Sequence, residues 1–240
     1  MNVLITGHSR GLGAALTDFH LAHGHRVYGL SRTRRAAAVV GLVEGQADFA
    51  QPETLPDALT ALIPSPIDFT CIYLNAGVLG PIAALGTTVL ATVRDVMEIN
   101  VWANKVVLDW LLARGFAPTQ VVMMSSGAAI SGNFGWGAYA LSKATLNMLA
   151  KLYAHEFPNT HLCALAPGLI ATAMQDEIAA QDATVFPSLA RLQAARGTAT
   201  MPTPDIVARR IVDALPRLRE LPSGTFVDLR DAFPAGSNAP

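Results

Sequence analysis

A tyrosine and a lysine four positions apart are the residues of this sequence whose types and spacing first suggest chemistry. Tyr139 and Lys143 lie in a helix-like segment, where positions i and i+4 share one face. An ammonium group beside a phenol favours the phenolate, so Lys143 is expected to lower the pKa of Tyr139 from about 10 toward neutrality. Tyr139 could then act as a general acid or base. Such a pair is common by chance, and taken alone it is better interpreted as a core tyrosine beside a surface lysine.

Ser126 adds a hydroxyl group to this pair. It follows the apolar run Val121–Met124, which is typical of a buried strand. A hydroxyl at the end of such a strand can reach the cleft at the carboxyl edge of a parallel sheet.

A glycine-rich turn near the start of the chain predicts a binding site for a dinucleotide. The run Thr6-Gly7-His8-Ser9-Arg10-Gly11-Leu12-Gly13 follows a predicted strand and precedes a predicted helix. In that context, backbone N–H groups and the helix dipole can hold a pyrophosphate. The spacing G-x-x-x-G-x-G differs from G-x-G-x-x-G, and glycines alone also serve ordinary tight turns.

The end of the second predicted strand indicates which dinucleotide is preferred. A protein that binds NAD commonly has an acidic residue there, which contacts the adenosine ribose. This chain instead has Ser31 and Arg32, and Arg10 lies in the glycine turn. A guanidinium can hold a 2′-phosphate through paired N–H bonds, whereas a carboxylate would repel it. The sequence therefore favours NADPH over NADH, with Arg34 and Arg35 interpreted as a solvated surface run.

Short apolar runs alternate with helix-length segments along the whole chain. Continuous hydrophobicity within a run predicts a strand that is buried on both faces. The predicted strands are Val3–Ile5, Val27–Leu30, Val43–Ala47, Phe69–Leu74, Val121–Met124, Leu162–Ala166 and Thr225–Leu229. The predicted helices span residues 11–23, 53–63, 88–113, 137–156 and 204–217. This alternation predicts one α/β domain over residues 1–240, a doubly wound parallel sheet of about seven strands with helices on both faces.

The stretch 169–203 differs from the rest because it contains no predicted strand. It carries Pro187, Gly197 and Pro202 and is too long for an ordinary connection. We expect it to form a substrate lid or a small helical insertion.

Composition limits the classes of function. The chain is 51% hydrophobic and 15% charged, which predicts a large core and excludes a disordered chain. A net charge of −1 and only three lysines argue against a nucleic-acid surface. The charge-free stretch from Gly115 to Ser142 is broken by glycines, serines and Pro118, so no membrane span is predicted. Cys71 and Cys163 lie in apolar runs and are expected to be buried free thiols, which fits a cytoplasmic protein. No targeting signal and no metal site are predicted.

Together these motifs resemble those of the short-chain dehydrogenase/reductase family, along almost the whole chain. The run from Thr6 to Gly13 is similar to the family's glycine motif. The resemblance implies a Rossmann-type fold, an NADP(H) cofactor and a small carbonyl compound as substrate. The other matching positions are Asp48 (the acid that contacts adenine), Asn75, Ala76 and Gly77 (the N-A-G turn), Asn100, Ser126, Tyr139 and Lys143 (the catalytic tetrad), and Pro167, Gly168, Ile170 and Thr172 (the segment that holds the nicotinamide carboxamide).

The resemblance also implies a role for each member of the tetrad. Ser126 would hydrogen-bond the substrate carbonyl, and Tyr139 would donate a proton as hydride arrives from the nicotinamide. Lys143 would bind the ribose hydroxyls and lower the pKa of Tyr139, while Asn100 would anchor a water in the proton relay. Structural alternatives stay open for Asn75 as a turn residue, Asn100 as a helix cap or kink, and Thr172 as the cap of a lid helix.

The C-terminal third resembles the branch of the family that contains sepiapterin reductases and benzil reductases. The resemblance lies in Ser31–Thr33, Ala173–Ile178, Phe186–Ser188 and Pro222–Asp231. It implies that Asp228 anchors the amino-pyrimidine of a pterin, although a strand-end acid paired with an arginine would fit as well. Trp136, Met174 and Phe186 are candidates for contacts with an aromatic substrate, although each also fits an ordinary core position.

The expected function is that of an NADPH-dependent carbonyl reductase. The expected substrate is a vicinal dicarbonyl or an α-hydroxy ketone with an aromatic or pterin-like group. A 3-oxoacyl thioester reductase is one alternative, and a non-catalytic NADPH-sensing module is another. The sequence lacks the glycine-rich ending common among acyl reductases, and its complete tetrad argues against a sensor. Apolar positions in the helices at 88–113 and 137–156, which commonly form a dimer contact in the family, predict a homodimer.

Overall fold

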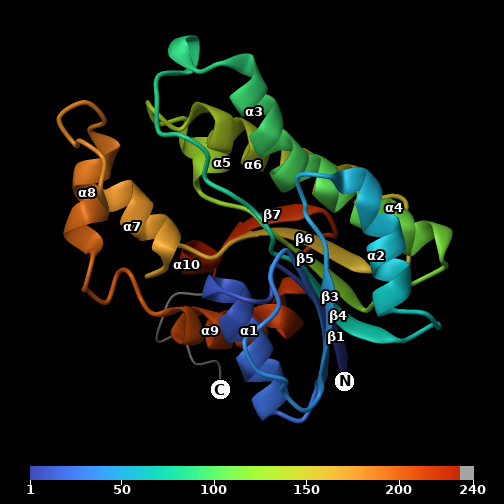
Figure 1. Ribbon diagram of the computed structural model, residues 1–240. Helices are drawn as coiled ribbons and strands as arrows, with labels where there is room; N and C mark the ends of the chain where they lie inside the picture. The colour runs from blue at the N-terminus through green and yellow to red at the C-terminus, as the bar shows by residue number, and fades with distance from the viewer. Residues whose placement is uncertain (233–240) are drawn as a thin grey trace.

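Buried apolar strands form the centre of the fold. In the computed structural model, which describes residues 1–232, they form one seven-stranded parallel sheet in the order β3-β2-β1-β4-β5-β6-β7 (Figure 1). The strands are β1 (Asn2–Thr6), β2 (Arg26–Ser31), β3 (Leu42–Gln46), β4 (Phe69–Leu74), β5 (Gln120–Met124), β6 (His161–Ala166) and β7 (Thr225–Asp228). The predicted parallel sheet is confirmed. Because all strands run in one direction, their carboxyl ends meet at a single edge.

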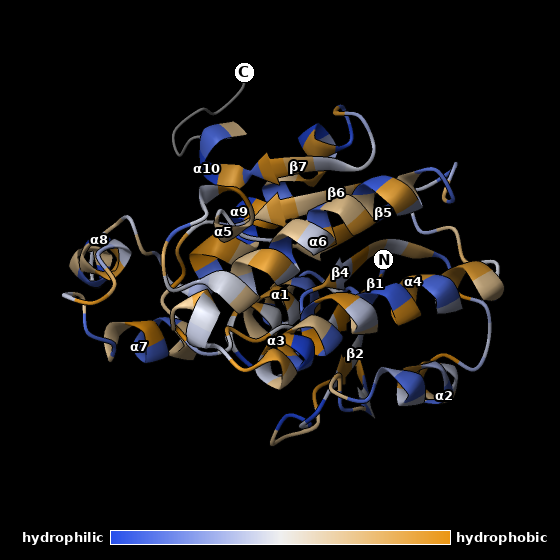
Figure 2. Ribbon diagram, turned by 90° about the horizontal axis from the view of Figure 1, so that it is seen from above, coloured by the Kyte–Doolittle hydropathy of each residue, from blue (hydrophilic) through white to orange (hydrophobic). Residues whose placement is uncertain are grey.

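Helices cover both faces of the sheet and enclose a separate apolar core on each side (Figure 1). One face packs against α1 (Gly11–Ala22) and α9 (Pro204–Leu218). The other packs against α2 (Leu55–Leu62), α4 (Ala103–Ala113) and α6 (Gly137–Ala154). Hydrophobic and hydrophilic residues alternate along helix α4 (Figure 2), as expected when one side of the helix faces the sheet and the other faces solvent.

The helix predicted over 88–113 is confirmed over residues 90–113, but it contains a π-helical turn that the sequence did not indicate. It consists of α3 (Leu90–Met97), a π-helical turn (Glu98–Trp102) and α4. Asn100 lies in the π-helical turn, where its side-chain amide pairs with both backbone groups of Val78. These bonds satisfy a buried polar side chain, and π-helical turns of this kind are frequent at functional sites.

The predicted lid segment forms two helices with a small core of their own. Helices α7 (Ala173–Ala179) and α8 (Ser188–Ala195) contribute Ile178, Leu189 and Leu192 to this core, which also contains Leu79 and Trp136. The indole Nε1 of Trp136 donates to Oγ of Ser188 at 2.9 Å, which fastens α8 to the body of the protein. The segment therefore has its own packing, separate from the two cores of the sheet.

Two expectations from composition can be compared with the structure. Cys71 and Cys163 are both free and buried, as predicted. Among residues 1–232, no helix combines the length and the apolar character that crossing a membrane would require.

Candidate active site

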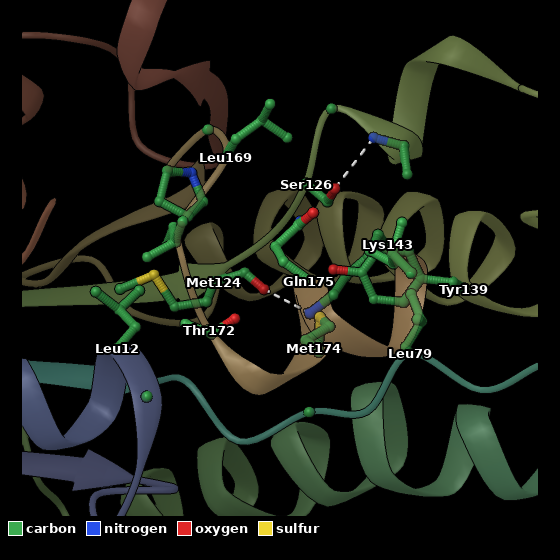
Figure 3. A pocket seen from close by; sticks show the side chains of 18 of the residues that line it. Leu12, Leu79, Met124, Ser126, Tyr139, Lys143, Leu169, Thr172, Met174 and Gln175 are labelled. Carbon is green, nitrogen blue, oxygen red and sulfur yellow. Dashed lines mark hydrogen bonds between the residues drawn. The ribbon is translucent and has the colours of Figure 1, made fainter. Parts of the chain in front are cut away.

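The site residues meet in a cavity of about 620 Å³ at the carboxyl edge of the sheet (Figure 3). In an open α/β sheet, ligands bind at this edge, where the order of strands reverses. Here the reversal lies between β1 and β4, and the loops after both strands line the cavity. The lining includes Gly7, Arg10, Gly11, Leu12, Asn75, Ala76, Gly77, Ser126, Trp136, Tyr139, Lys143, Pro167, Gly168, Ile170, Thr172, Met174 and Arg230.

The glycine turn has a shape that side chains would prevent. Gly7 and Gly11 have φ values of +69° and +55°, which L residues rarely adopt. A Cβ atom at Gly13 would lie 2.1 Å from the carbonyl oxygen of Gly7, so only glycine fits there. The side-chain amide of Asn75 donates to the carbonyl of Thr6 at 3.1 Å and to that of Gly7 at 3.3 Å. The turn is thus held open as a backbone cradle, which fits the pyrophosphate of a dinucleotide.

The residues predicted to contact the adenosine end, Ser9, Ser31, Arg32 and Asp48, are not among those that line the cavity; they lie in the glycine turn and in the segments at the ends of β2 and β3. Ser31 is buried, and its Oγ donates to the carbonyl of Thr33 at 2.7 Å. The Oγ of Ser9, in the glycine turn, lies 3.2 Å from Oγ1 of Thr33, so the two loops touch. The side chain of Arg32 is exposed. The Asp48 carboxylate accepts from the backbone N–H of Ala50, which shapes the turn after β3.

Ser126, Tyr139 and Lys143 come together on the cavity wall (Figure 3). Tyr139 and Lys143 are presented by α6, and Ser126 follows β5. The Nζ atom of Lys143 donates to the carbonyl of Met124 at 2.7 Å and lies 5.6 Å from the centroid of the Tyr139 ring. The predicted grouping of a hydroxyl, a phenol and an ammonium is therefore present.

The predicted lowering of the Tyr139 pKa is wrong for this arrangement. Burial raises the pKa of Tyr139, and a hydrogen bond with Ser126 opposes that effect only in part. Burial also lowers the pKa of Lys143 to about 8. The ammonium is directed at the Met124 carbonyl rather than at the phenol oxygen, so burial outweighs charge. The phenol is thus kept protonated, which is the form that can donate a proton.

Asn100 joins the loop after β4 to α6. Its Nδ2 donates to Oγ of Ser142 and to the carbonyl of Val78, both at 2.9 Å, and its Oδ1 accepts from the N–H of Val78 at 2.8 Å. The backbone carbonyl of Asn100 accepts from Nδ2 of Asn104 at 2.8 Å. A Cβ atom at Gly77 would lie 3.1 Å from Oδ1 of Asn100, so the loop approaches this amide closely. In this structure Asn100 positions the loop and the helix that line the site.

The predicted substrate residues divide into two groups. Trp136 and Met174 line the cavity. Phe186 is not among the lining residues, and its ring stacks on Phe134 with centroids 5.6 Å apart. Asp228 is not among them either, and its carboxylate is held by Arg230.

The alternative that Asp228 pairs with an arginine is confirmed by its ion pair with Arg230, but sequence reasoning did not identify Arg230 as a residue that lines the cavity. The available signal was an arginine two positions after the acid that ends the last strand. That spacing allows a local ion pair in which the arginine, rather than the acid, faces a ligand.

Comparisons with known proteins agree with this geometry. The pattern of the short chain dehydrogenase family matches residues 1–183. A benzil reductase ((S)-benzoin forming) of Bacillus subtilis is 30% identical over 241 residues, covering 95% of this chain and 98% of the relative. A sepiapterin reductase of Meriones unguiculatus is 28% identical, covering 95% of each chain.

Solved structures show the same fold. A short-chain dehydrogenase/reductase from Saccharomyces cerevisiae has a TM-score of 0.83 at 22% identity, covering 98% of both chains. A 4-hydroxyisoleucine dehydrogenase solved with NADH has a TM-score of 0.77 at 18% identity, covering 95% of this chain and 96% of the other. The family match, the parallel sheet and the grouping of Ser126, Tyr139 and Lys143 agree, and this chain belongs to the short-chain dehydrogenase/reductase family of NAD(P)-dependent oxidoreductases.

Proposed function

We propose that this protein reduces a ketone with NADPH, and that its substrate is a vicinal dicarbonyl or an α-hydroxy ketone with an aromatic or pterin-like group. One observation carries the proposal. Ser126, Tyr139 and Lys143 lie on the wall of the same 620 Å³ cavity that contains the glycine turn. A substrate carbonyl at this wall would be within reach of both a proton donor and a dinucleotide.

Each residue has a task that follows from its surroundings. NADPH, when bound, supplies the hydride. Ser126 donates a hydrogen bond to the substrate carbonyl and orients it toward Tyr139. Tyr139 gives its proton to the carbonyl oxygen, a transfer that the raised pKa of the phenol allows because the phenol starts protonated. Lys143 supplies a positive charge that stabilises the phenolate left behind.

The choice of NADPH rests on the cations near the adenosine end. Arg10 lines the cavity, and the exposed Arg32 lies in the loop after β2 that touches the glycine turn. Arg35 is paired with Asp18 at 2.6 Å, so it is less available. Residues 30–35 contain no acid that would repel a 2′-phosphate.

The substrate class is supported by the cavity lining and by the relatives. Leu79, Trp136 and Met174 give one side of the cavity an apolar and aromatic character. Such a surface suits a flat ring system. Two of the similar proteins bear the names benzil reductase and sepiapterin reductase, and a benzil reductase reduces one carbonyl of a vicinal dicarbonyl.

The proposal includes assembly into a homodimer. Leu141, Met148 and Leu152 lie along one side of α6 and are each about half exposed, at 48%, 53% and 55%. Trp102, on the neighbouring π-helical turn, is 39% exposed. By contrast, Leu146, another apolar residue of this helix, is fully buried in the protein's own core. A second copy of the chain would cover the exposed side chains.

We expect the wild-type protein to oxidise NADPH in the presence of benzil or sepiapterin, as measured by the loss of NADPH absorbance. Tyr139→Phe should lower kcat by about 10²- to 10⁴-fold, because it removes the proton donor. NADPH binding, measured by fluorescence titration, should stay within about twofold of wild type. Turnover of neither compound by the wild type, or full activity of Tyr139→Phe, would contradict the proposed reaction.

Arg32→Gln should raise the KM for NADPH by about 10- to 100-fold, since it removes a charged hydrogen bond to the 2′-phosphate. The KM for NADH, which lacks this phosphate, should change little. Arg34→Gln serves as the control, because Arg34 is an exposed arginine of the same loop. An equal loss of affinity for NADPH and NADH would show that Arg32 does not bind the 2′-phosphate.

The pH profile should reflect Lys143. Its ammonium form decreases as pH rises through about 8, so kcat/KM for reduction should fall above that pH. The phenol of Tyr139, with its raised pKa, keeps its proton over the same range and does not cause this decline. Ser126→Ala should give the same profile at lower amplitude. A profile that stays flat up to about pH 10 would refute the assignment.

Light scattering should give twice the 25.3 kDa mass of one chain. The double substitution Met148→Glu with Leu152→Glu should shift the mass to that of one chain, because burying two carboxylates in an apolar contact is unfavourable. Val40→Glu, at a position that is 98% exposed, is the matched control. A wild-type mass of 25.3 kDa would exclude the dimer.

A further inference from the structure

The side chain of Arg230 lies near the loops that follow β5 and β6, in the cavity that Ser126 and Tyr139 also line. A Cβ atom at Gly168, which follows β6, would lie 2.9 Å from Cδ of Arg230. A Cβ atom at Gly127, which follows Ser126, would lie 3.6 Å from Nη2 of Arg230. The arginine stem therefore occupies space that a side chain at Gly168 would fill, and its head group comes into contact range of Gly127, the residue after Ser126.

Asp228 fixes the orientation of this guanidinium. The Nε atom of Arg230 donates to Oδ1 of Asp228 at 2.9 Å, and Nη2 donates to Oδ2 at 2.6 Å. The backbone N–H of Arg230 also donates to Oδ1, at 3.0 Å. Burial alone would raise the pKa of Asp228, but the hydrogen bonds and charge of Arg230 outweigh burial and hold the pKa below its ordinary value. The pair is thus ionised and held at two points, which restricts rotation of the arginine head group.

Part of the guanidinium is left to bind a ligand. It has five N–H donors, and Asp228 takes one from Nε and one from Nη2. Within residues 1–232, no further hydrogen bond from the Arg230 side chain accompanies these two. Arg230 lines the cavity and its side chain is 48% exposed, whereas the carboxylate that holds it is 11% exposed.

We propose that Arg230 donates a hydrogen bond to an uncharged oxygen on the carbon next to the reacting carbonyl. This inference rests on the proposed function and assigns the residue that recognises the oxygen shared by its substrate class. Ser126 and Tyr139 hold the carbonyl that is reduced, and Arg230 holds the neighbouring oxygen of a dicarbonyl or hydroxy ketone. Asp228 already balances the charge of Arg230, so the pair suits a neutral oxygen better than a carboxylate.

Two-point binding of this kind also selects which carbonyl is reduced. In an unsymmetrical vicinal dicarbonyl, either carbonyl could lie at Ser126, with the other at Arg230. The cavity places apolar and aromatic side chains such as Trp136 and Met174 along its wall, so the two orientations differ in energy. Asp228 then acts as a positioning residue through Arg230, rather than as a direct anchor of the substrate.

The test compares two substrates that differ only in the neighbouring oxygen. Benzil has a second carbonyl, and deoxybenzoin has a CH₂ group in its place. Arg230→Met keeps an unbranched apolar stem that reaches about as far as Nε but removes all of the donors. It should lower kcat/KM for benzil by about 10- to 100-fold, mainly by raising KM. The kcat/KM for deoxybenzoin should stay within about twofold of the wild-type value. Arg209→Met, at an exposed arginine of α9, is the control and should leave kcat/KM for both substrates unchanged.

A second readout separates binding at Arg230 from a general loss of structure. With 1-phenylpropane-1,2-dione, the wild type should form one regioisomeric hydroxy ketone in excess, and Arg230→Met should form a more even mixture. Asp228→Asn should give the same changes in smaller measure, because Arg230 remains but is less firmly held. NADPH affinity and thermal midpoint should match wild type in both variants, which excludes misfolding as the cause.

The outcomes distinguish the two proposals. Suppose that the wild type reduces benzil, but that Arg230→Met lowers kcat/KM equally for both substrates or for neither. The role of Arg230 is then overturned and the proposed function stands. If Asp228→Asn impairs sepiapterin far more than benzil, Asp228 anchors the pterin directly and the role of Arg230 is again overturned. If the wild type reduces no vicinal dicarbonyl with NADPH, both proposals fail together.

Discussion

The buried amide of Asn100 holds together the parts of the protein that make the site. It binds both backbone groups of Val78, in the loop after β4, and it donates to Ser142 on α6. Helix α6 also carries Tyr139 and Lys143, so one side chain fixes the loop on one side of the cavity relative to the residues on the other. Asn100 lies in a π-helical turn in the middle of a long helix. An unpaired amide at this depth would be strongly destabilising, which makes the three-way connection rigid.

Burial at this junction also determines the protonation of the site. It lowers the pKa of Lys143 to about 8 and raises the pKa of Tyr139. If only the charge of the nearby Lys143 ammonium mattered, the pKa of Tyr139 would be lowered. The Met124 carbonyl accepts a hydrogen bond from Lys143 and holds the ammonium 5.6 Å from the centroid of the Tyr139 ring. A carbonyl at the end of β5 therefore positions the ammonium relative to the phenol.

Much of the fold could be predicted from the sequence, because a short and continuously apolar run between turn residues is typical of a strand covered on both faces. All seven strands and the glycine turn lie where hydrophobicity and spacing indicated.

The π-helical turn could not be predicted, since it accompanies a contact between Asn100 and Val78, 22 residues apart in the chain. The position of Phe186 could not be predicted either, because an aromatic ring fits a cavity wall and a stack on Phe134 equally well. The sequence marks Asp228 as an acid at the end of the last strand, but only the structure shows that Arg230 stands between it and the cavity.

The separate core of α7 and α8 has a consequence for how this protein can diversify. Leu189 and Leu192 pack with Trp136 and Leu79, away from the two cores that stabilise the sheet. Substitutions in these two helices therefore change the ceiling of the cavity while the strands and the glycine turn keep their packing. Tyr139 also packs against this small core, so the wall that carries the phenol is a part of the sheet domain that responds to changes in α7 and α8. A laboratory library restricted to residues 173–195 would therefore vary the cavity above a sheet and a glycine turn that keep their own packing.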